Sequence, residues 1–241
     1  KNINIHARKG EILGISGLMG AGRTELALSM FGALPSAHTG ELYIDNKKVI
    51  INSPQDAIKE GLGYVSEDRK QYGLVKGFDI KMNMSLANLD LISKTGVIDK
   101  NVEIIQALEY IASMNVRCSS PEQQAFNLSG GNQQKVILAK WLLTKSKVLI
   151  LDEPTSSLST RETEQLLDVM RRLKKEGVGI IFITHFIDQV YQISDRVTII
   201  RNGGLVGTYE TAKLPKMELI TRMIGKTITV LDEMYKTKEE I

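Results

Sequence analysis

The chain has 241 residues with a formal net charge of +3, and 42% of the residues are hydrophobic. This length and composition suit one folded domain with a sizeable core. The small charge and the lack of a run of basic residues argue against a nucleic-acid partner. No apolar stretch reaches the roughly 20 residues that cross a bilayer, and the start does not resemble a secretory signal. Cys118 is the single cysteine, so no internal disulfide can form. We therefore expect a soluble cytosolic protein that can dock on a partner.

Short apolar runs that end at glycine or at polar residues alternate with segments of helical periodicity. Ser159 and Glu162 have the spacing of a capping box at the start of one such helix. The alternation predicts an α/β fold with a mostly parallel sheet covered on both faces. We expect strands over residues 11–16, 63–66, 148–151, 179–184 and 196–201, a hairpin over 40–51 with its turn near Asn46, and helices over 24–31, 133–143 and 161–176.

Residues 79–127 differ from the rest in composition and periodicity, because they are rich in methionine and asparagine at first and then show a helical pattern. We interpret them as a helical subdomain inserted into the core. The predicted organisation is thus a single domain, 1–241, with a core and small antiparallel β subdomain formed by 1–78 and 128–225. The charged residues 226–241 are expected to form a tail.

The stretch "GLMGAGRT", residues 17–24, lies between an expected strand and an expected helix. Backbone N–H groups of a glycine-rich loop at a helix start can surround a phosphate chain, and the Thr24 hydroxyl falls where a magnesium ligand belongs. Arg23 occupies the position where such loops carry lysine, and a tight glycine turn explains the stretch equally well. The candidate nucleotide-binding residues are Gly17, Leu18, Met19, Gly20, Ala21, Gly22, Arg23, Thr24 and Glu25.

Asp152 and Glu153 follow an apolar strand, at the edge where a parallel sheet presents its ligands. An aspartate there can hold magnesium, and a neighbouring glutamate can polarise the attacking water. An acid pair that starts a helix before Pro154 is the plainer alternative. Two phosphate-handling features at the ends of two strands favour the first interpretation.

The stretch "LSGGNQQK", residues 128–135, places a second glycine-rich segment at a helix N-terminus, where N–H donors and the helix dipole favour an anion. One nucleotide does not need two glycine-rich helix N-termini. A head-to-tail pair of domains does need them, because each domain then closes the other's site. Here the sequence resembles an ATP-binding cassette (ABC) protein over essentially its whole length, which implies a P-loop NTPase core.

The resemblance implies a role for each motif. Residues 17–24 resemble the Walker A loop, and Val148 to Glu153 resemble Walker B with Glu153 as catalytic base. His185 is similar to the switch histidine that contacts the γ-phosphate. Residues 156–159 resemble the D-loop, in which Ser159 departs from the common aspartate. The signature residues, which meet a partner's nucleotide, are Ser129, Gly130, Gly131 and Asn132, the last in place of the usual glutamine.

The stretch "GYVSEDRK", residues 63–70, places Glu67 where most cassettes have the glutamine that links magnesium to the membrane subunit. Together with the two glycine-rich stretches, it resembles the second cassette of ribose, xylose and galactoside importers. The C-terminal part, with His185, resembles the first cassette, so both a natural variant and a hybrid remain open. Only residues 1–9 precede the first expected strand, which implies either a piece of a two-cassette protein or a loosely held adenine.

The resemblance implies a sugar-importer ATPase that uses ATP and Mg²⁺ at the cytoplasmic face of the membrane. Its partners are a second cassette, on the same or another chain, and a transmembrane permease. We expect Arg23 to lie outside the loop or to grip phosphate from its rim, so that hydrolysis is slow. The alternatives are a competent ATPase, a cassette that binds nucleotide and only completes its partner's site, and a soluble ABC protein outside transport. The sugar cannot be inferred from this chain.

Overall fold

The computed structural model describes residues 3–34 and 39–225, and the expected tail lies outside this part. The strands are β1 (Ile12–Ser16), β2 (Leu42–Ile44), β3 (Lys47–Val49), β4 (Leu62–Val65), β5 (Ser93–Lys94), β6 (Val97–Ile98), β7 (Val148–Asp152), β8 (Gly179–Ile183), β9 (Arg196–Arg201) and β10 (Gly204–Glu210). The helices are α1 (Arg23–Met30), α2 (Pro54–Lys59), α3 (Ile80–Ser85), α4 (Leu89–Ile92), α5 (Lys100–Ser113), α6 (Gly130–Leu142), α7 (Thr160–Lys175), α8 (Ile187–Ile193) and α9 (Lys216–Ile224). A π-helical turn covers Arg69–Gly73.

The main sheet has six strands in the order β10-β9-β1-β8-β7-β4. All neighbouring pairs are parallel except β9 with β10, which are antiparallel. Two antiparallel pairs, β2 with β3 and β5 with β6, form separate small sheets. The expected α/β fold with a mostly parallel sheet is therefore confirmed.

Side chains that alternate along the central strands enter different apolar clusters, as the two-residue period of a strand requires. Ile180 and Phe182 of β8 join the large cluster that contains Leu166 and Leu167 of α7. Their neighbours on β8 join a second cluster with Ala27 of α1. Helices α7 and α1 thus cover opposite faces of the sheet, and the buried run Gly179–Ile183 has no solvent face.

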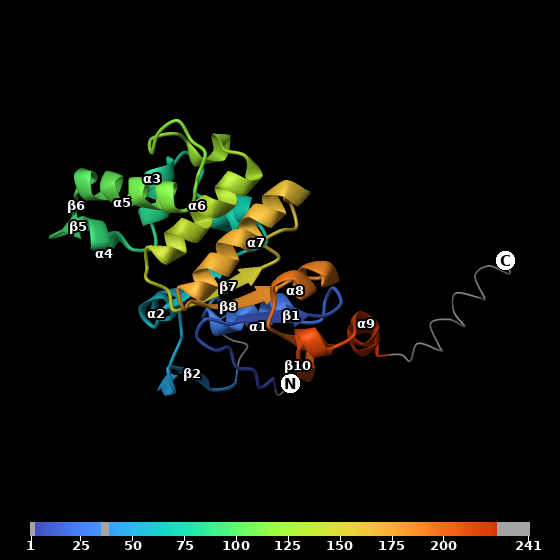
Figure 1. The fold of residues 1–241 in the computed structure, drawn as a ribbon. Helices are drawn as coiled ribbons and strands as arrows, with labels where there is room; N and C mark the ends of the chain where they lie inside the picture. The colour runs from blue at the N-terminus through green and yellow to red at the C-terminus, as the bar shows by residue number, and fades with distance from the viewer. Residues whose placement is uncertain (1–2, 35–38, 226–241) are drawn as a thin grey trace.

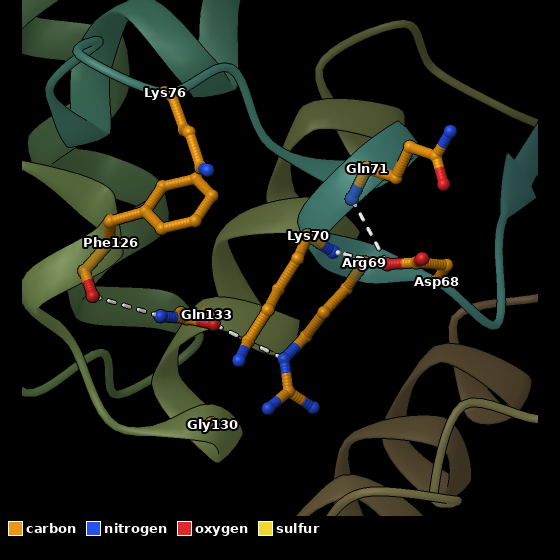
Figure 2. Close-up of a pocket in the computed structure, with 8 residues that line it drawn as sticks. All are labelled: Asp68, Arg69, Lys70, Gln71, Lys76, Phe126, Gly130 and Gln133. Atoms are coloured by element: carbon orange, nitrogen blue, oxygen red, sulfur yellow. Dashed lines mark hydrogen bonds between the residues drawn. The ribbon is translucent and has the colours of Figure 1, made fainter.

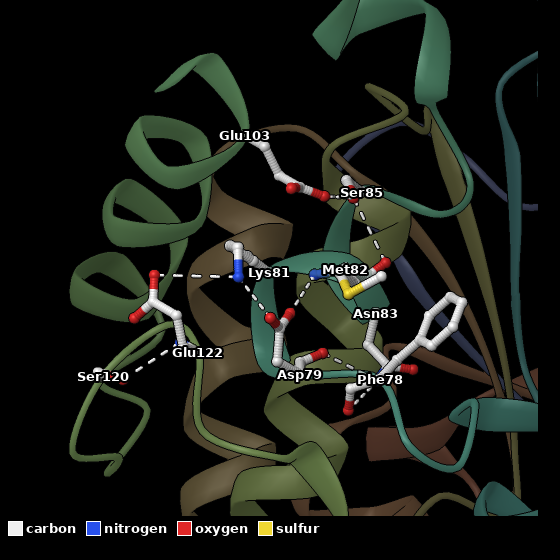
Figure 3. A network of polar contacts seen from close by, with 9 residues as sticks. All are labelled: Phe78, Asp79, Lys81, Met82, Asn83, Ser85, Glu103, Ser120 and Glu122. Atoms are coloured by element: carbon white, nitrogen blue, oxygen red, sulfur yellow. Dashed lines mark hydrogen bonds and ion pairs between the residues drawn. The ribbon is translucent and has the colours of Figure 1, made fainter. Parts of the chain in front are cut away.

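Helices α3, α4, α5 and α6 gather at one end of the molecule, away from β10 and α9 (Figure 1). Polar side chains tie this region together, as Figure 3 shows. Asp79 accepts a hydrogen bond from the Met82 amide at 2.9 Å and pairs with Lys81. Ser85 donates to the buried Glu103 of α5 at 2.7 Å. The helices expected for residues 79–127 are present, while the division into subdomains stays a prediction.

Two local predictions are confirmed in detail. The turn of the β2–β3 hairpin lies at Asp45 and Asn46, which both have positive φ. Helix α7 begins with the complete capping box of Ser159 and Glu162. Helix α6 begins at Gly130, three residues before the expected start. Within the described residues, no helix combines the length and apolar character that crossing a membrane requires.

Candidate functional site

The sheet register brings the candidate residues to one edge. Asp152 is paired with Ile183, and Ile183 with Ile15, so β7, β8 and β1 end at the same level. The chain leaves this edge into the glycine-rich loop after β1, into Glu153 after β7 and into His185 after β8. The carboxyl ends of parallel strands are where such sheets bind ligands. Three motifs that are far apart in sequence are therefore neighbours in space.

The glycine-rich loop is fixed from outside by the turn between β9 and β10. Ala21 accepts a hydrogen bond from the Gly203 amide at 3.0 Å. A Cβ at position 17 would lie 2.4 Å from the Ile200 carbonyl oxygen, so Gly17 permits a contact that no other residue allows. Gly22, with φ +90°, makes the sharp entry into α1.

The amides of the loop are available to a ligand. Within the described residues, the N–H groups of Gly20, Gly22, Arg23 and Thr24 donate no hydrogen bond. A Cβ at Gly20 would meet no atom of the described residues within 4 Å, so these residues leave the space over the loop open. Unpaired amides at a helix start form the cradle that an anion needs.

Asp152 lies at the bottom of this edge and is fully buried. One carboxylate oxygen accepts a hydrogen bond from the Tyr64 hydroxyl at 3.0 Å, while Oδ1 has no partner of good geometry in the described part of the chain. Burial raises the pKa of Asp152, and hydrogen bonds from Tyr64 and the Thr24 hydroxyl oppose that rise. The nearby charge of Glu67 adds to it. The Thr24 hydroxyl therefore lies near the Asp152 carboxylate, and their shared role in holding magnesium stays a prediction.

Arg23 departs from the prediction. Its side chain does not lie outside the loop, because the residue is only 8% exposed and its Nη1 lies 3.0 Å from Oε1 of Glu153. The alternative, that Arg23 grips phosphate from the rim of the loop, stays a prediction. The N–H is not aligned for a hydrogen bond, so charge holds the pair. Two carboxylates at the end of β7 leave negative charge in a buried place, and a long guanidinium on the first turn of α1 can reach it.

Glu153 is engaged on both carboxylate oxygens. Its Oε2 lies 3.0 Å from Nδ1 of His185 and also accepts the His185 amide at 3.3 Å. Its backbone has φ 45°, a left-handed conformation that costs a non-glycine residue of order 1–3 kcal/mol. Strain of this kind at a sheet edge is typical of functional sites. The candidate base therefore contacts the arginine on one side and the candidate switch histidine on the other.

These residues fit a nucleoside triphosphate with magnesium. The free loop amides suit phosphate oxygens, and the unpartnered Oδ1 of Asp152 beside Thr24 suits a hard cation. No group of three or more His, Cys, Asp or Glu side chains in the described residues can hold a metal. Magnesium does not need one, since it is commonly held by one or two protein oxygens together with substrate phosphates.

The signature residues lie elsewhere, at the start of α6. No hydrogen bond or ion pair in the described residues joins Ser129–Asn132 to the glycine-rich loop, so the two glycine-rich ends are separate. The Gly131 amide donates to Oε1 of Glu162 at 2.8 Å, and Oε2 of the same carboxylate accepts the Ser159 amide at 3.1 Å. These backbone hydrogen bonds lower the pKa of Glu162. One carboxylate therefore caps both α6 and α7.

Sequence reasoning missed three residues with central contacts. Tyr64 binds Asp152, Glu162 binds Gly131, and Arg69 contacts Gln133 and Ser157. Tyr64 and Arg69 belong to the quoted stretch "GYVSEDRK", and Glu162 was recognised only as half of a capping box. Their partners are 31 to 88 positions away, so no local pattern indicates the contacts.

Comparison with known proteins agrees with this geometry. The xylose import ATP-binding protein XylG of Thermoanaerobacter pseudethanolicus is 45% identical over 208 residues, which cover 86% of this chain and 41% of that protein. The ribose import ATP-binding protein RbsA of Halalkalibacterium halodurans is 44% identical over 225 residues, which cover 93% of this chain and 45% of that protein. The chain thus spans less than half the length of these relatives.

Solved structures show the same fold at lower identity. The cassette MJ0796 bound to ADP and Pi aligns with a TM-score of 0.71 at 23% identity, covering 88% of this chain and 90% of that one. The structure of cbiO1 from Clostridium perfringens gives a TM-score of 0.75 at 22% identity, covering 98% and 91%. The family model described as ABC transporter matches residues 1–156. The chain belongs to the ABC transporter family.

Proposed function

We propose that this chain is a nucleotide-binding domain of a monosaccharide importer, which binds ATP with Mg²⁺ and couples that binding to sugar uptake. The observation that carries the proposal is the meeting of free loop amides with Thr24 and Asp152 at one sheet edge. The names of the relatives, xylose and ribose import ATP-binding proteins, support sugar as the cargo.

In this proposal each residue of the edge has one task. The free amides of Gly20, Gly22, Arg23 and Thr24 hold the phosphates. Thr24 and Asp152 hold magnesium, which when bound neutralises charge on the phosphates. Glu153 orients the attacking water, and His185 contacts the terminal phosphate. Glu67 is the position that links the site to the membrane subunit.

The ion pair of Arg23 with Glu153 favours slow hydrolysis. Both carboxylate oxygens of Glu153 are engaged, Oε1 by Arg23 and Oε2 by His185, each at 3.0 Å, so the carboxylate must give up a contact before it can orient water. The same observation favours a second candidate function: a cassette that binds nucleotide without hydrolysing it and completes its partner's site with Ser129–Asn132.

The partners in the proposal are a second cassette and a transmembrane permease at the cytoplasmic face of the membrane. The separate signature end supports the first partner, because an anion site without its own magnesium residues needs a nucleotide from elsewhere. Copurification with a permease rather than with ribosomes is the expected result, and it separates this function from that of a non-transport ABC protein.

The test is a titration with MgATP together with a hydrolysis assay on the parent and on Asp152→Asn. We expect the parent to bind MgATP and the variant to lose magnesium-dependent affinity. If magnesium has no effect on the parent's affinity, the assignment of Thr24 and Asp152 is wrong. If ATP does not bind at all, the proposed function fails.

A further inference from the structure

The strongest unassigned feature is a side chain that joins three motifs. Arg69 lies in the segment that follows Glu67, and its Nε donates to Oε1 of Gln133 on α6 at 3.1 Å. Its Nη1 donates to the hydroxyl of Ser157 in the D-loop segment. A Cβ at Gly130 would lie 2.8 Å from the guanidinium, so the signature glycine leaves room for it. Figure 2 shows Arg69 between its own turn and the start of α6.

The turn that carries Arg69 is held on both sides. The Asp68 carboxylate accepts the amides of Lys70 and Gln71, each at 3.0 Å. At the other end, the buried Lys140 of α6 donates to the Gly73 carbonyl at 2.7 Å. The turn therefore rests on α6, and a shift of the turn shifts the guanidinium.

Gln133 connects Arg69 to the signature segment. Its amide nitrogen donates to the carbonyl oxygens of Phe126 and Leu128, each at 3.1 Å, and its side chain is buried. Because Leu128 directly precedes Ser129, Gln133 fixes the chain entering the signature. Glu162 already joins Gly131 to Ser159, so what Arg69 adds is the connection to the Glu67 segment.

We propose that Arg69 is a positioning residue that couples the segment following Glu67 to the signature end of α6. Movement of residues 67–70 then changes the placement of Ser129–Asn132 before a partner's phosphate chain. The structural coupling stands on the contacts above, and only its consequence for the partner's nucleotide rests on the proposed function.

The structural part is tested by hydrogen–deuterium exchange on the intact protein. We expect Arg69→Gln to speed exchange over residues 129–134 by about ten-fold, which corresponds to roughly 1.4 kcal/mol of local stability. Exchange over β1 should stay at the parent rate. Arg69→Lys keeps the positive charge but not the planar guanidinium with its several donors, so we expect an intermediate exchange rate over residues 129–134. The matched control is Lys70→Gln, because the exposed Lys70 side chain makes no hydrogen bond or ion pair in the described residues.

A double-mutant cycle separates coupling from simple loosening. Asp68→Ala removes the cap of the turn, and we expect it to speed exchange over 129–134 in the parent but to add nothing in Arg69→Gln. An unchanged rate in Arg69→Gln, or additive effects of the two substitutions, would overturn the coupling. If Arg69→Gln also speeds exchange over β1, the cycle is run with Arg69→Lys and judged in the same way.

The functional part uses MgATP. We expect Arg69→Gln to lower the turnover of the paired cassettes about ten-fold while the affinity of this chain's own loop for MgATP stays within two-fold of the parent. Equal loss of both, or loss of neither, contradicts a positioning role. A parent that binds no MgATP refutes the proposed function instead and leaves the exchange result to decide the coupling.

Discussion

Replacing Arg23 by lysine tests how this site works. The substitution keeps a positive charge but replaces a broad guanidinium by a compact ammonium on a shorter reach. In the structure the guanidinium lies 3.0 Å from Glu153 and both side chains are at most 9% exposed. We expect the lysine to leave Glu153 and to contact phosphate, so that the base is released and a phosphate contact is gained.

The expected change in hydrolysis rate follows from the ion pair that is lost and from the phosphate contact that is gained. At the observed 3.0 Å and an effective dielectric constant near 20, the attraction is about 5 kcal/mol. Desolvation of both groups offsets part of it. A contact to charge that develops in the transition state contributes about 3 to 4 kcal/mol. We therefore expect Arg23→Lys to raise the rate by roughly 100-fold or more, since about 1.4 kcal/mol is a factor of ten.

The assay is steady-state phosphate release with MgATP in excess. Arg23→Gln separates the two causes, because it frees Glu153 without supplying a cation, and its rate should lie between those of the parent and of Arg23→Lys. Arg171→Lys, at an exposed surface pair with Asp168, is the matched control and should hydrolyse like the parent. A rate for Arg23→Lys within three-fold of the parent would refute the account of the loop.

Three further predictions follow from the same structure. Glu153→Gln should lower any hydrolysis by about 100-fold or more and keep MgATP binding, and a variant as fast as the parent would exclude Glu153 as the base. Gly17→Ala should cost about 1–3 kcal/mol in the free energy of unfolding because its Cβ meets the Ile200 carbonyl. Gly40→Ala, whose Cβ would meet no atom of the described residues within 4 Å, should be neutral in the same urea titration. Glu162→Gln should cost about 1 kcal/mol at neutral pH through the two weakened caps. Because the folded pKa of Glu162 is lowered from 4.5, its contribution is complete above that value and is lost as the pH falls through the lowered pKa. Parent and variant should therefore converge in stability in acid, and a constant difference would contradict this role.

The main features of the site could be predicted from sequence because they depend on local rules. A strand that ends in a glycine loop or in two acids presents those residues at the carboxyl edge of a parallel sheet, whatever the strand order. This is enough to bring Thr24 to Asp152. The order itself, with β1 between β8 and β9, depends on crossover connections that periodicity does not reveal.

The prediction that Arg23 lies outside the loop was wrong because it considered the loop alone. The position of a long cation depends on where the nearest buried anion lies, and Glu153 is 130 positions further along the chain. The predicted start of α6 was wrong for another reason. Glycines 130 and 131 are poor helix formers by themselves, but Glu162 caps the Gly131 amide and so favours the earlier start.

The two candidate anion sites of this chain differ in their contacts. At the loop, the candidate base is strained at φ 45° and held by Arg23, so the contacts oppose its use. At the signature, Glu162 and Arg69 satisfy the surrounding groups and hold the segment in place. Preorganised donors serve a reaction best when they need no rearrangement as charge develops. This difference agrees with the second candidate function proposed above, in which the cassette completes its partner's site and its own loop mainly binds nucleotide.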